Sequence, residues 1–172
     1  MEFELNLDHL KKFAYEIVSR LKNQEKPIFL CVGSDKFVCD SMAPIVGEML
    51  TQKYNINTFV YGGLEYNINA NNVSQAINYI ESRHPCNPVV VIDATLGENV
   101  GKVRIDNGSY VGLAKVLPIR KLGNFSILGV VGKNHKNFDL NSTRLQVVMS
   151  LAKFISKGIA MSMDYLEKSC YV

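Results

Sequence analysis

The sequence lacks long apolar runs and clusters of basic residues. No stretch approaches the roughly 20 continuous apolar residues that a membrane-spanning helix needs. The first residues, MEFELNLDHLKKF, are acidic where a signal peptide is basic, so we expect a cytoplasmic protein without a membrane partner. The net charge is only +3, and the lysines and arginines are interspersed with acidic residues, which argues against nucleic acid as a principal partner.

Paired cysteine spacings are missing too. The four cysteines, Cys31, Cys39, Cys86 and Cys170, form no CxxC motif, which argues against a zinc site and against a disulfide framework. Cys31 lies in an apolar run that is typical of a buried strand. Cys39 lies in a polar loop with no histidine nearby in the sequence to activate it, so a small loop residue is a better interpretation than a nucleophile.

The apolar residues that are present predict one α/β domain over residues 1–172, because a chain of this length with 47% apolar residues can fill one core. Helical spacing of apolar residues predicts helices near residues 7–21, 42–50, 73–83 and 141–166. Apolar runs rich in β-branched residues predict strands within 27–33, 56–63, 87–97, 100–106 and 125–132. This alternation predicts a three-layer α/β/α sandwich with a mostly parallel sheet.

Two aspartates fall at the carboxyl ends of predicted strands, where open α/β sheets bind their ligands. Asp40 ends the loop that follows PIFLCVG, and Asp93 closes VVVID. Pro44 is tolerated only in a first helical turn, which places the helix N-cap at about Ser41 and Asp40 just outside the helix. On spacing alone, a cap or a surface acid is the simpler interpretation of Asp40. Asp93 is a stronger candidate, because an acid that directly follows four apolar strand residues lies near the core and needs a partner or a ligand. Its simpler interpretation is a carboxylate that accepts backbone N–H groups from the turn ATLG.

If the two strands are neighbours, both acids face one crevice. Paired carboxylates can share a proton, activate a water or hold a metal, and the residues do not choose among these. The loop from Gly33 to Ser41 leads into a helix as an anion-binding loop does, but it lacks GxxxxGK[ST] and GxGxxG and carries two aspartates. His135 follows the last strand at the same edge, where it could serve as a third catalytic group or metal ligand, but a solvated histidine is the simpler interpretation.

Five segments follow one another over about residues 29–159: CVGSDKFVCDSMAPIVGEML, VYGGLEYNINANN, VVVIDATLGENVGKV, LPIRKLGNFSILGVVG and LNSTRLQVVMSLAKFISKGI. Together they resemble the YyaC-type sporulation proteins of spore-forming Firmicutes. That family is related to the germination protease that degrades small acid-soluble spore proteins, and more distantly to the hydrogenase maturation proteases.

The resemblance implies a phosphorylase/hydrolase-like fold and marks Asp40 and Asp93 as the counterparts of the suspected catalytic pair of the germination protease. The chain also departs from the family pattern. It reads GSDKFVCDSMAP where the family reads closer to GTDRSTGDSLGP, and Asn69 stands where relatives tend to carry a histidine. These departures weaken a metal-assisted mechanism.

The first hypothesis is therefore a sporulation-associated, peptidase-like hydrolase of the sporulating cell or forespore. One of Asp40 and Asp93 would activate water, and the other, its pKa raised by its neighbour, would donate a proton. Backbone N–H groups of the first loop would stabilise an oxyanion. The residues expected to bind substrate or to orient the pair are Gly33, Ser34, Asp35 and Ser41.

The second hypothesis is a non-catalytic sporulation factor that binds a peptide or a client protein in the same crevice. A third is a metal-sensing peptidase of the maturation type, which predicts that nickel, cadmium or zinc raises the melting temperature. For the preferred reading we expect no cofactor, no metal, and a peptide or protein as partner. The residues leave the oligomeric state open, a homo-oligomer included.

Overall fold

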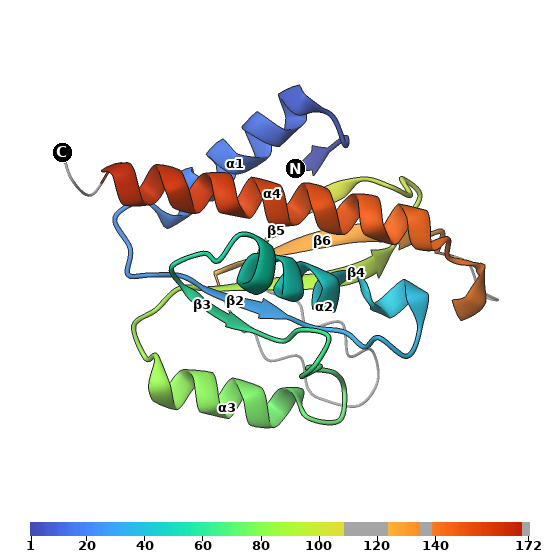
Figure 1. Cartoon of the computed structure of the whole chain (residues 1–172), viewed down its shortest axis with the longest axis horizontal. Coiled ribbons are helices and arrows are strands. Elements are labelled where there is room, and N and C mark those ends of the chain that lie inside the picture. The colour runs from blue at the N-terminus through green and yellow to red at the C-terminus, as the bar shows by residue number, and fades with distance from the viewer. Residues whose placement is uncertain (109–123, 135–138, 170–172) are drawn as a thin grey trace.

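A computed structural model describes residues 1–108, 124–134 and 139–169 (Figure 1). Its centre is a six-stranded sheet with the strand order β1-β5-β6-β4-β2-β3. The strands are β1 (Glu2–Phe3), β2 (Ile28–Cys31), β3 (Phe59–Tyr61), β4 (Val89–Leu96), β5 (Val103–Asn107) and β6 (Phe125–Gly132). Strands β3, β2, β4 and β6 run parallel to their neighbours, whereas β5 is antiparallel to β6, and β1 is antiparallel to β5. The predicted mostly parallel sheet is confirmed.

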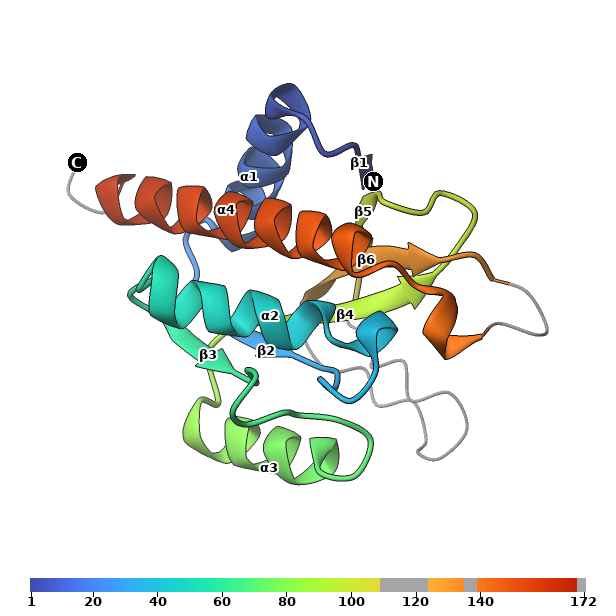
Figure 2. The same cartoon turned by 45° about the vertical axis from the view of Figure 1, so that its right-hand side comes forward.

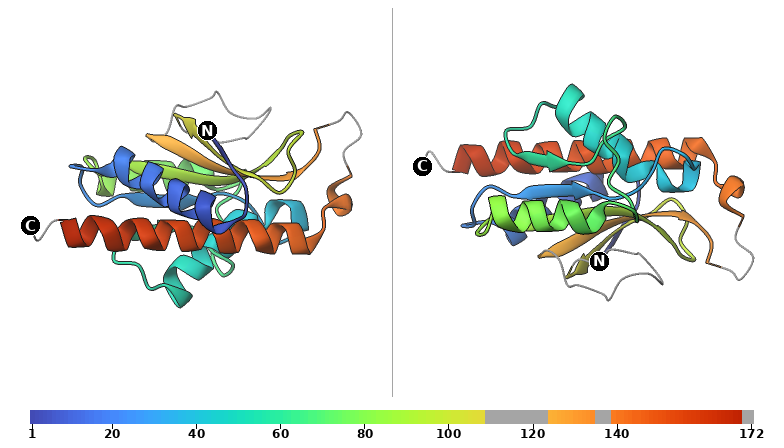
Figure 3. Two further views of the ribbon diagram at one scale, coloured as in Figure 1. Left: turned by 90° about the horizontal axis from the view of Figure 1, so that it is seen from above. Right: turned by 90° about the horizontal axis from the view of Figure 1, so that it is seen from below.

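Helices cover both faces of this sheet. They are α1 (Leu7–Leu21), α2 (Met42–Glu48), α3 (Val73–Arg83) and α4 (Leu145–Ser169), with short turns η1 (Val38–Asp40), η2 (Met49–Lys53) and η3 (Leu140–Ser142). Helices α1, α2 and α4 pack on one face and α3 on the other (Figure 2). Helix α4 runs along the whole length of the sheet (Figure 3). The predicted three-layer α/β/α sandwich is confirmed.

The central strands are apolar on both sides because both sides are covered. In β2, Phe29 and Cys31 pack toward α1, α2 and α4, whereas Ile28 and Leu30 pack toward α3. All four side chains are fully buried. Strand β4 alternates in the same way, which explains why neither strand shows the polar alternation of a half-exposed sheet. The prediction that Cys31 is a core residue is confirmed.

Helix α2 lies unusually close to the sheet because glycines stand at the contact. A Cβ atom at Gly47 would lie 2.0 Å from the carbonyl oxygen of Gly62, and one at Gly62 would lie 2.1 Å from that of Cys31. Gly62 also has a φ of 92°, which other residues rarely adopt. These contacts hold the C-terminal part of α2 against the carboxyl ends of β2 and β3, the end of the sheet where the candidate site lies.

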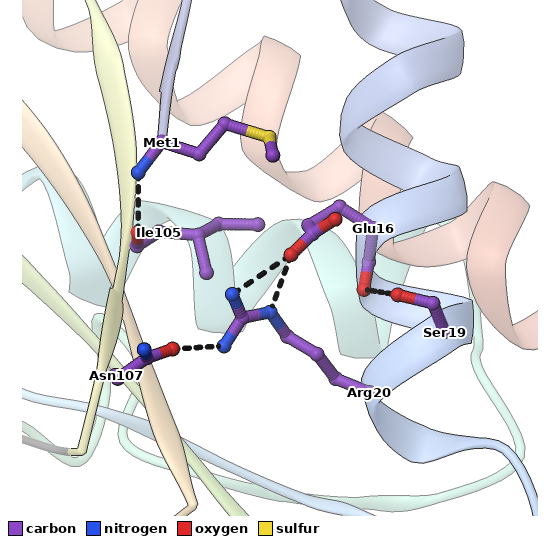
Figure 4. A network of polar contacts seen from close by, with 6 residues as sticks. All are labelled: Met1, Glu16, Ser19, Arg20, Ile105 and Asn107. Atoms are coloured by element: carbon purple, nitrogen blue, oxygen red, sulfur yellow. Dashed lines mark hydrogen bonds and ion pairs between the residues drawn. The ribbon is translucent and has the colours of Figure 1, made fainter.

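The opposite edge of the sheet is held by polar contacts that the sequence did not predict (Figure 4). The N-terminal ammonium group donates to the Ile105 carbonyl oxygen at 2.9 Å. Arg20, in the last turn of α1, donates to the Glu16 carboxylate and to the Asn107 amide oxygen, each at 2.8 Å. Strand β1 therefore pairs with β5, a strand far away in the sequence, and α1 is anchored to β5 as well.

Candidate functional site

The loop between β2 and α2 closes on itself at its base. The Gly33 N–H group donates to the Ile68 carbonyl oxygen at 2.7 Å, and the Ser34 N–H group donates to the Asp40 carbonyl oxygen at 3.1 Å. A Cβ atom at Gly33 would lie 2.2 Å from that Asp40 oxygen, so only glycine fits there. The close contact brings Asp40 back to the end of β2.

Asp40 lies in η1, immediately before α2. The N-cap of α2 is Ser41, as the sequence predicted, but its hydroxyl donates to the Val38 carbonyl oxygen at 2.9 Å and makes no capping bond. Pro44 is buried in the first turn, where its missing N–H group leaves no bond unmade. Ser41 thus stabilises the turn that presents Asp40.

Asp93 lies on β4 at a point where the neighbouring strand β2 has ended. Cys31, the last residue of β2, pairs with Ile92, so Asp93 is one position beyond it. The segment ATL, predicted as a turn, continues β4, because Ala94 and Thr95 pair with β6 on the other side. The Asp93 side chain is only 9% exposed, and the Ala94 N–H group donates to its Oδ1 atom at 2.7 Å.

Both aspartates line one cavity of about 270 Å³ at the carboxyl ends of β2 and β4. The lining residues come from the first loop, from β4 and from the segment before α3: Val32, Gly33, Ser34, Lys36, Phe37, Asp40, Asn69, Ala70, Asn71 and Asp93. Of the predicted site residues, Asp35 and Ser41 are not among these described lining residues. The Asp35 N–H group instead donates to the Asn67 amide oxygen at 2.8 Å and joins the two loops.

Burial sets the electrostatics of this cavity. It raises the pKa of the Asp40 carboxyl above its ordinary value, and the Ser34 backbone N–H group partly opposes the rise. The sequence predicted a neighbouring carboxylate as the cause of a raised pKa, whereas desolvation by burial is the largest cause for Asp40. Burial and then the Asp40 charge also raise the pKa of the Cys39 thiol, which keeps it protonated and opposes a role as a nucleophile.

The backbone N–H groups at the start of the loop are already engaged. Those of Gly33 and Ser34 bind the carbonyl oxygens named above, that of Asp35 binds Asn67, and that of Lys36 binds the Ser34 hydroxyl at 3.3 Å. The expectation that the glycine-containing part of this loop forms an oxyanion hole is therefore wrong for these four groups. Lys36 is the cationic side chain among the described residues that line the cavity.

Neither a metal cluster nor a membrane-spanning helix occurs in the part of the chain that the structure describes. No group of three or more histidine, cysteine, aspartate or glutamate side chains there is placed to hold a metal ion. No helix of that part is long and apolar enough to cross a bilayer. His135, considered above as a third ligand, lies outside the described residues.

Comparison with known proteins agrees with the fold and the motifs. Residues 2–158 match the family described as "Protein of unknown function (DUF1256)". The chain belongs to this family. It is 34% identical over 145 residues to "Uncharacterized protein YyaC" of Bacillus subtilis (strain 168). The aligned region covers 80% of this chain and 70% of that protein. The resemblance to YyaC-type proteins is thereby confirmed.

Solved structures share the fold at low sequence identity. The peptidyl-tRNA hydrolase from Acinetobacter baumannii superposes with a TM-score of 0.57 at 13% identity, over 85% of this chain and 90% of its own. The [NiFe] hydrogenase maturation protease HycI from Thermococcus kodakarensis KOD1 gives a TM-score of 0.47 at 16% identity, over 84% of this chain and 98% of its own. The former likeness shows a three-layer hydrolase-like α/β fold.

Five lining residues were not singled out as site residues in the sequence: Val32, Lys36, Phe37, Ala70 and Asn71. Asn69 had been noted only as a departure from the family pattern, and it too lines the cavity. The segment reaches the site because Ile68 pairs with Val32 just past the end of β2. A sequence signal existed in the asparagine-rich stretch NINANN, but its position depended on that distant pairing.

Proposed function

We propose that this protein is a hydrolase of peptides in which Asp40 and Asp93 act as an acid–base pair. The observation that carries the proposal is that Asp40 and Asp93, from separate elements, line one cavity, and that burial raises the pKa of Asp40. A carboxyl group that keeps its proton is suited to donate it, and a second carboxylate is suited to activate water. The resemblance to YyaC-type proteins supports a role in sporulating cells.

The roles can be assigned from the environments of the two groups. Asp93, oriented by the Ala94 N–H group, would remove a proton from a water whose oxygen attacks the peptide carbonyl carbon. Asp40 would give its proton to the leaving nitrogen as the C–N bond breaks, yielding a carboxylic acid and an amine. Lys36 would stabilise the charge that develops on the carbonyl oxygen, because the nearest backbone donors are occupied.

The test is cleavage of a peptide library that includes unfolded small acid-soluble spore proteins, with new termini detected by mass spectrometry. Wild type should cleave, and Asp40→Asn and Asp93→Asn should each lose at least about a hundredfold in rate while remaining folded by circular dichroism. Asp164→Asn, which changes an exposed aspartate on α4, is the matched control and should cleave like wild type.

The alternative of a non-catalytic factor makes a different prediction. It is supported by the neutral side chains of Asn69 and Asn71, which can hold a ligand without reacting with it. If wild type binds peptides but releases no new termini under any condition that keeps it folded, the hydrolase proposal is wrong and the binding factor replaces it.

A further inference from the structure

We propose that the segment 67–72 recognises the main chain of an extended peptide, and that Asn71 makes the contact. This inference rests on the proposed function, because it describes how the substrate of the same cavity is held. Because such a contact is made to the peptide backbone, the site should accept peptides of many sequences.

The asparagines of this segment divide into two kinds. The side chain of Asn67 accepts from the Asp35 N–H group and donates to the carbonyl oxygens of Gly63 and Leu64. The side chain of Asn72 accepts from the Asn69 N–H group at 2.8 Å and donates to the Asn67 carbonyl oxygen at 2.9 Å. Both amide ends of each residue are therefore used to shape the segment.

The other kind lines the cavity. The Asn69 oxygen accepts from the Asn71 N–H group at 3.1 Å, which orients the turn. Within the described residues, the Asn71 side-chain amide has no hydrogen-bond partner, although it belongs to the wall of the cavity. The hydrogen bond from its N–H group fixes the main chain at this position, and the exposed side-chain amide keeps its donor and its acceptor available to a ligand.

A peptide unit is the natural complement of such a group. It presents one N–H donor and one carbonyl acceptor, and an asparagine side chain presents the matching acceptor and donor. The first loop adds Phe37, a residue that is 46% exposed although it lines the same cavity, and such a surface suits an apolar side chain. The Asp93 carboxylate in the cavity disfavours phosphate groups, so a nucleotide fits this wall less well than a peptide does.

The experiment measures binding of fluorescein-labelled decapeptides with a central apolar residue by fluorescence anisotropy. Asp40→Asn is the background, so that bound peptide is not cleaved. Asn71→Ala on this background should weaken binding about tenfold, which corresponds to one or two lost hydrogen bonds. Asn78→Ala, which changes an exposed asparagine on α3 that is not a described lining residue, is the matched control and should bind like the background protein.

A second measurement identifies the group that Asn71 contacts. Peptides methylated at one backbone nitrogen at a time should include one that binds the control about tenfold more weakly, and this loss should be absent in Asn71→Ala. Equal peptide binding by Asn71→Ala and Asn78→Ala, or a methylation effect of the same size in both, would overturn the inference, as would no peptide binding at all.

The outcomes separate this inference from the proposed function. Binding that depends on Asn71 without cleavage by wild type would contradict only the hydrolase. Cleavage that depends on both aspartates, with no effect of Asn71, would contradict only the main-chain contact. Because the Asn71 side chain has no partner among the described residues, Asn71→Ala should melt within about 1 °C of the control, and this melt shows that the variant is folded.

Discussion

The two ends of the central strands each carry a cavity, and the larger one is not the candidate site. At the amino ends lies a cavity of about 370 Å³, against about 270 Å³ at the carboxyl ends. Asn124 accepts there from the Val89 N–H group at 3.0 Å, and Asn87 donates to the Lys26 carbonyl oxygen at 2.8 Å. His84 and the Tyr61 hydroxyl are hydrogen-bonded at 2.8 Å. The polar side chains of this end tie strands and helices together.

At the carboxyl ends, backbone hydrogen bonds make most of the contacts that hold the segments together. Backbone contacts close the loop from Gly33 to Asp40, and Asn67 and Asn72 shape the facing segment. Ionisable and amide side chains are left to line the cavity, one of them with a raised pKa. The size of a cavity therefore says little about function here, whereas the use made of its polar side chains distinguishes the two ends.

The largest effect is expected from filling the contact that closes the carboxyl-end loop. In Gly33→Ala the new Cβ atom would lie 2.2 Å from the Asp40 carbonyl oxygen, so the loop must move and carry Asp40 with it. We expect a loss of about 3 kcal/mol in the free energy of unfolding from strain and overpacking, and loss of peptide cleavage. Urea unfolding and cleavage rates measure the two effects.

Gly101→Ala is the matched control for that variant. Gly101 also has a positive φ, 86°, but a Cβ atom there would meet nothing within 4 Å. It should lose only about 1 kcal/mol from backbone strain and keep full activity. Equal losses in the two variants would show that the contact with Asp40 has no special weight.

A smaller effect, confined to stability, is expected at the amino end. Asn124→Ala removes the acceptor of the Val89 N–H group at the start of β4, which should lower the free energy of unfolding by about 1 kcal/mol. Peptide cleavage and peptide binding should be unchanged, because the residue lies at the other end of the strand. A loss of activity with unchanged stability would break the division between the two ends.

Much of the fold can be predicted from local patterns of apolar residues, and the bounds of the helices and strands show where those patterns are not sufficient. Helices α1 and α3 and strand β6 have the predicted bounds, because their apolar periodicity or runs are uninterrupted. Strand β1 was not predicted, since two residues carry no period and its partner β5 lies about a hundred residues away. Helix α4 begins at Leu145 rather than near residue 141, because the turn η3 precedes it.

The candidate site divides in the same way. The sequence indicates the strand ends that bring Asp40 and Asp93 to one crevice, and in the structure β2 pairs with β4 and both residues line one cavity. The occupied N–H groups of the loop and the position of Asn71 do not follow, because they depend on contacts such as Asp35 with Asn67 and Val32 with Ile68. Those pairs are separated by more than thirty residues in the chain, beyond the reach of any local signal.

The smallest expected effect is on the pH dependence of stability, and it arises from Asp40 at the carboxyl-end cavity. Because burial raises the Asp40 pKa, the folded protein holds this proton more tightly than the unfolded chain does. That contribution to stability is complete below the ordinary pKa of 3.8 and is lost as the pH rises through the folded value. The amide in Asp40→Asn does not titrate, so its melting temperature relative to wild type should increase as the pH rises above the ordinary pKa of 3.8 and should level off above the folded pKa. A flat or falling difference for Asp40→Asn would mean that the Asp40 carboxyl is not desolvated in the folded protein.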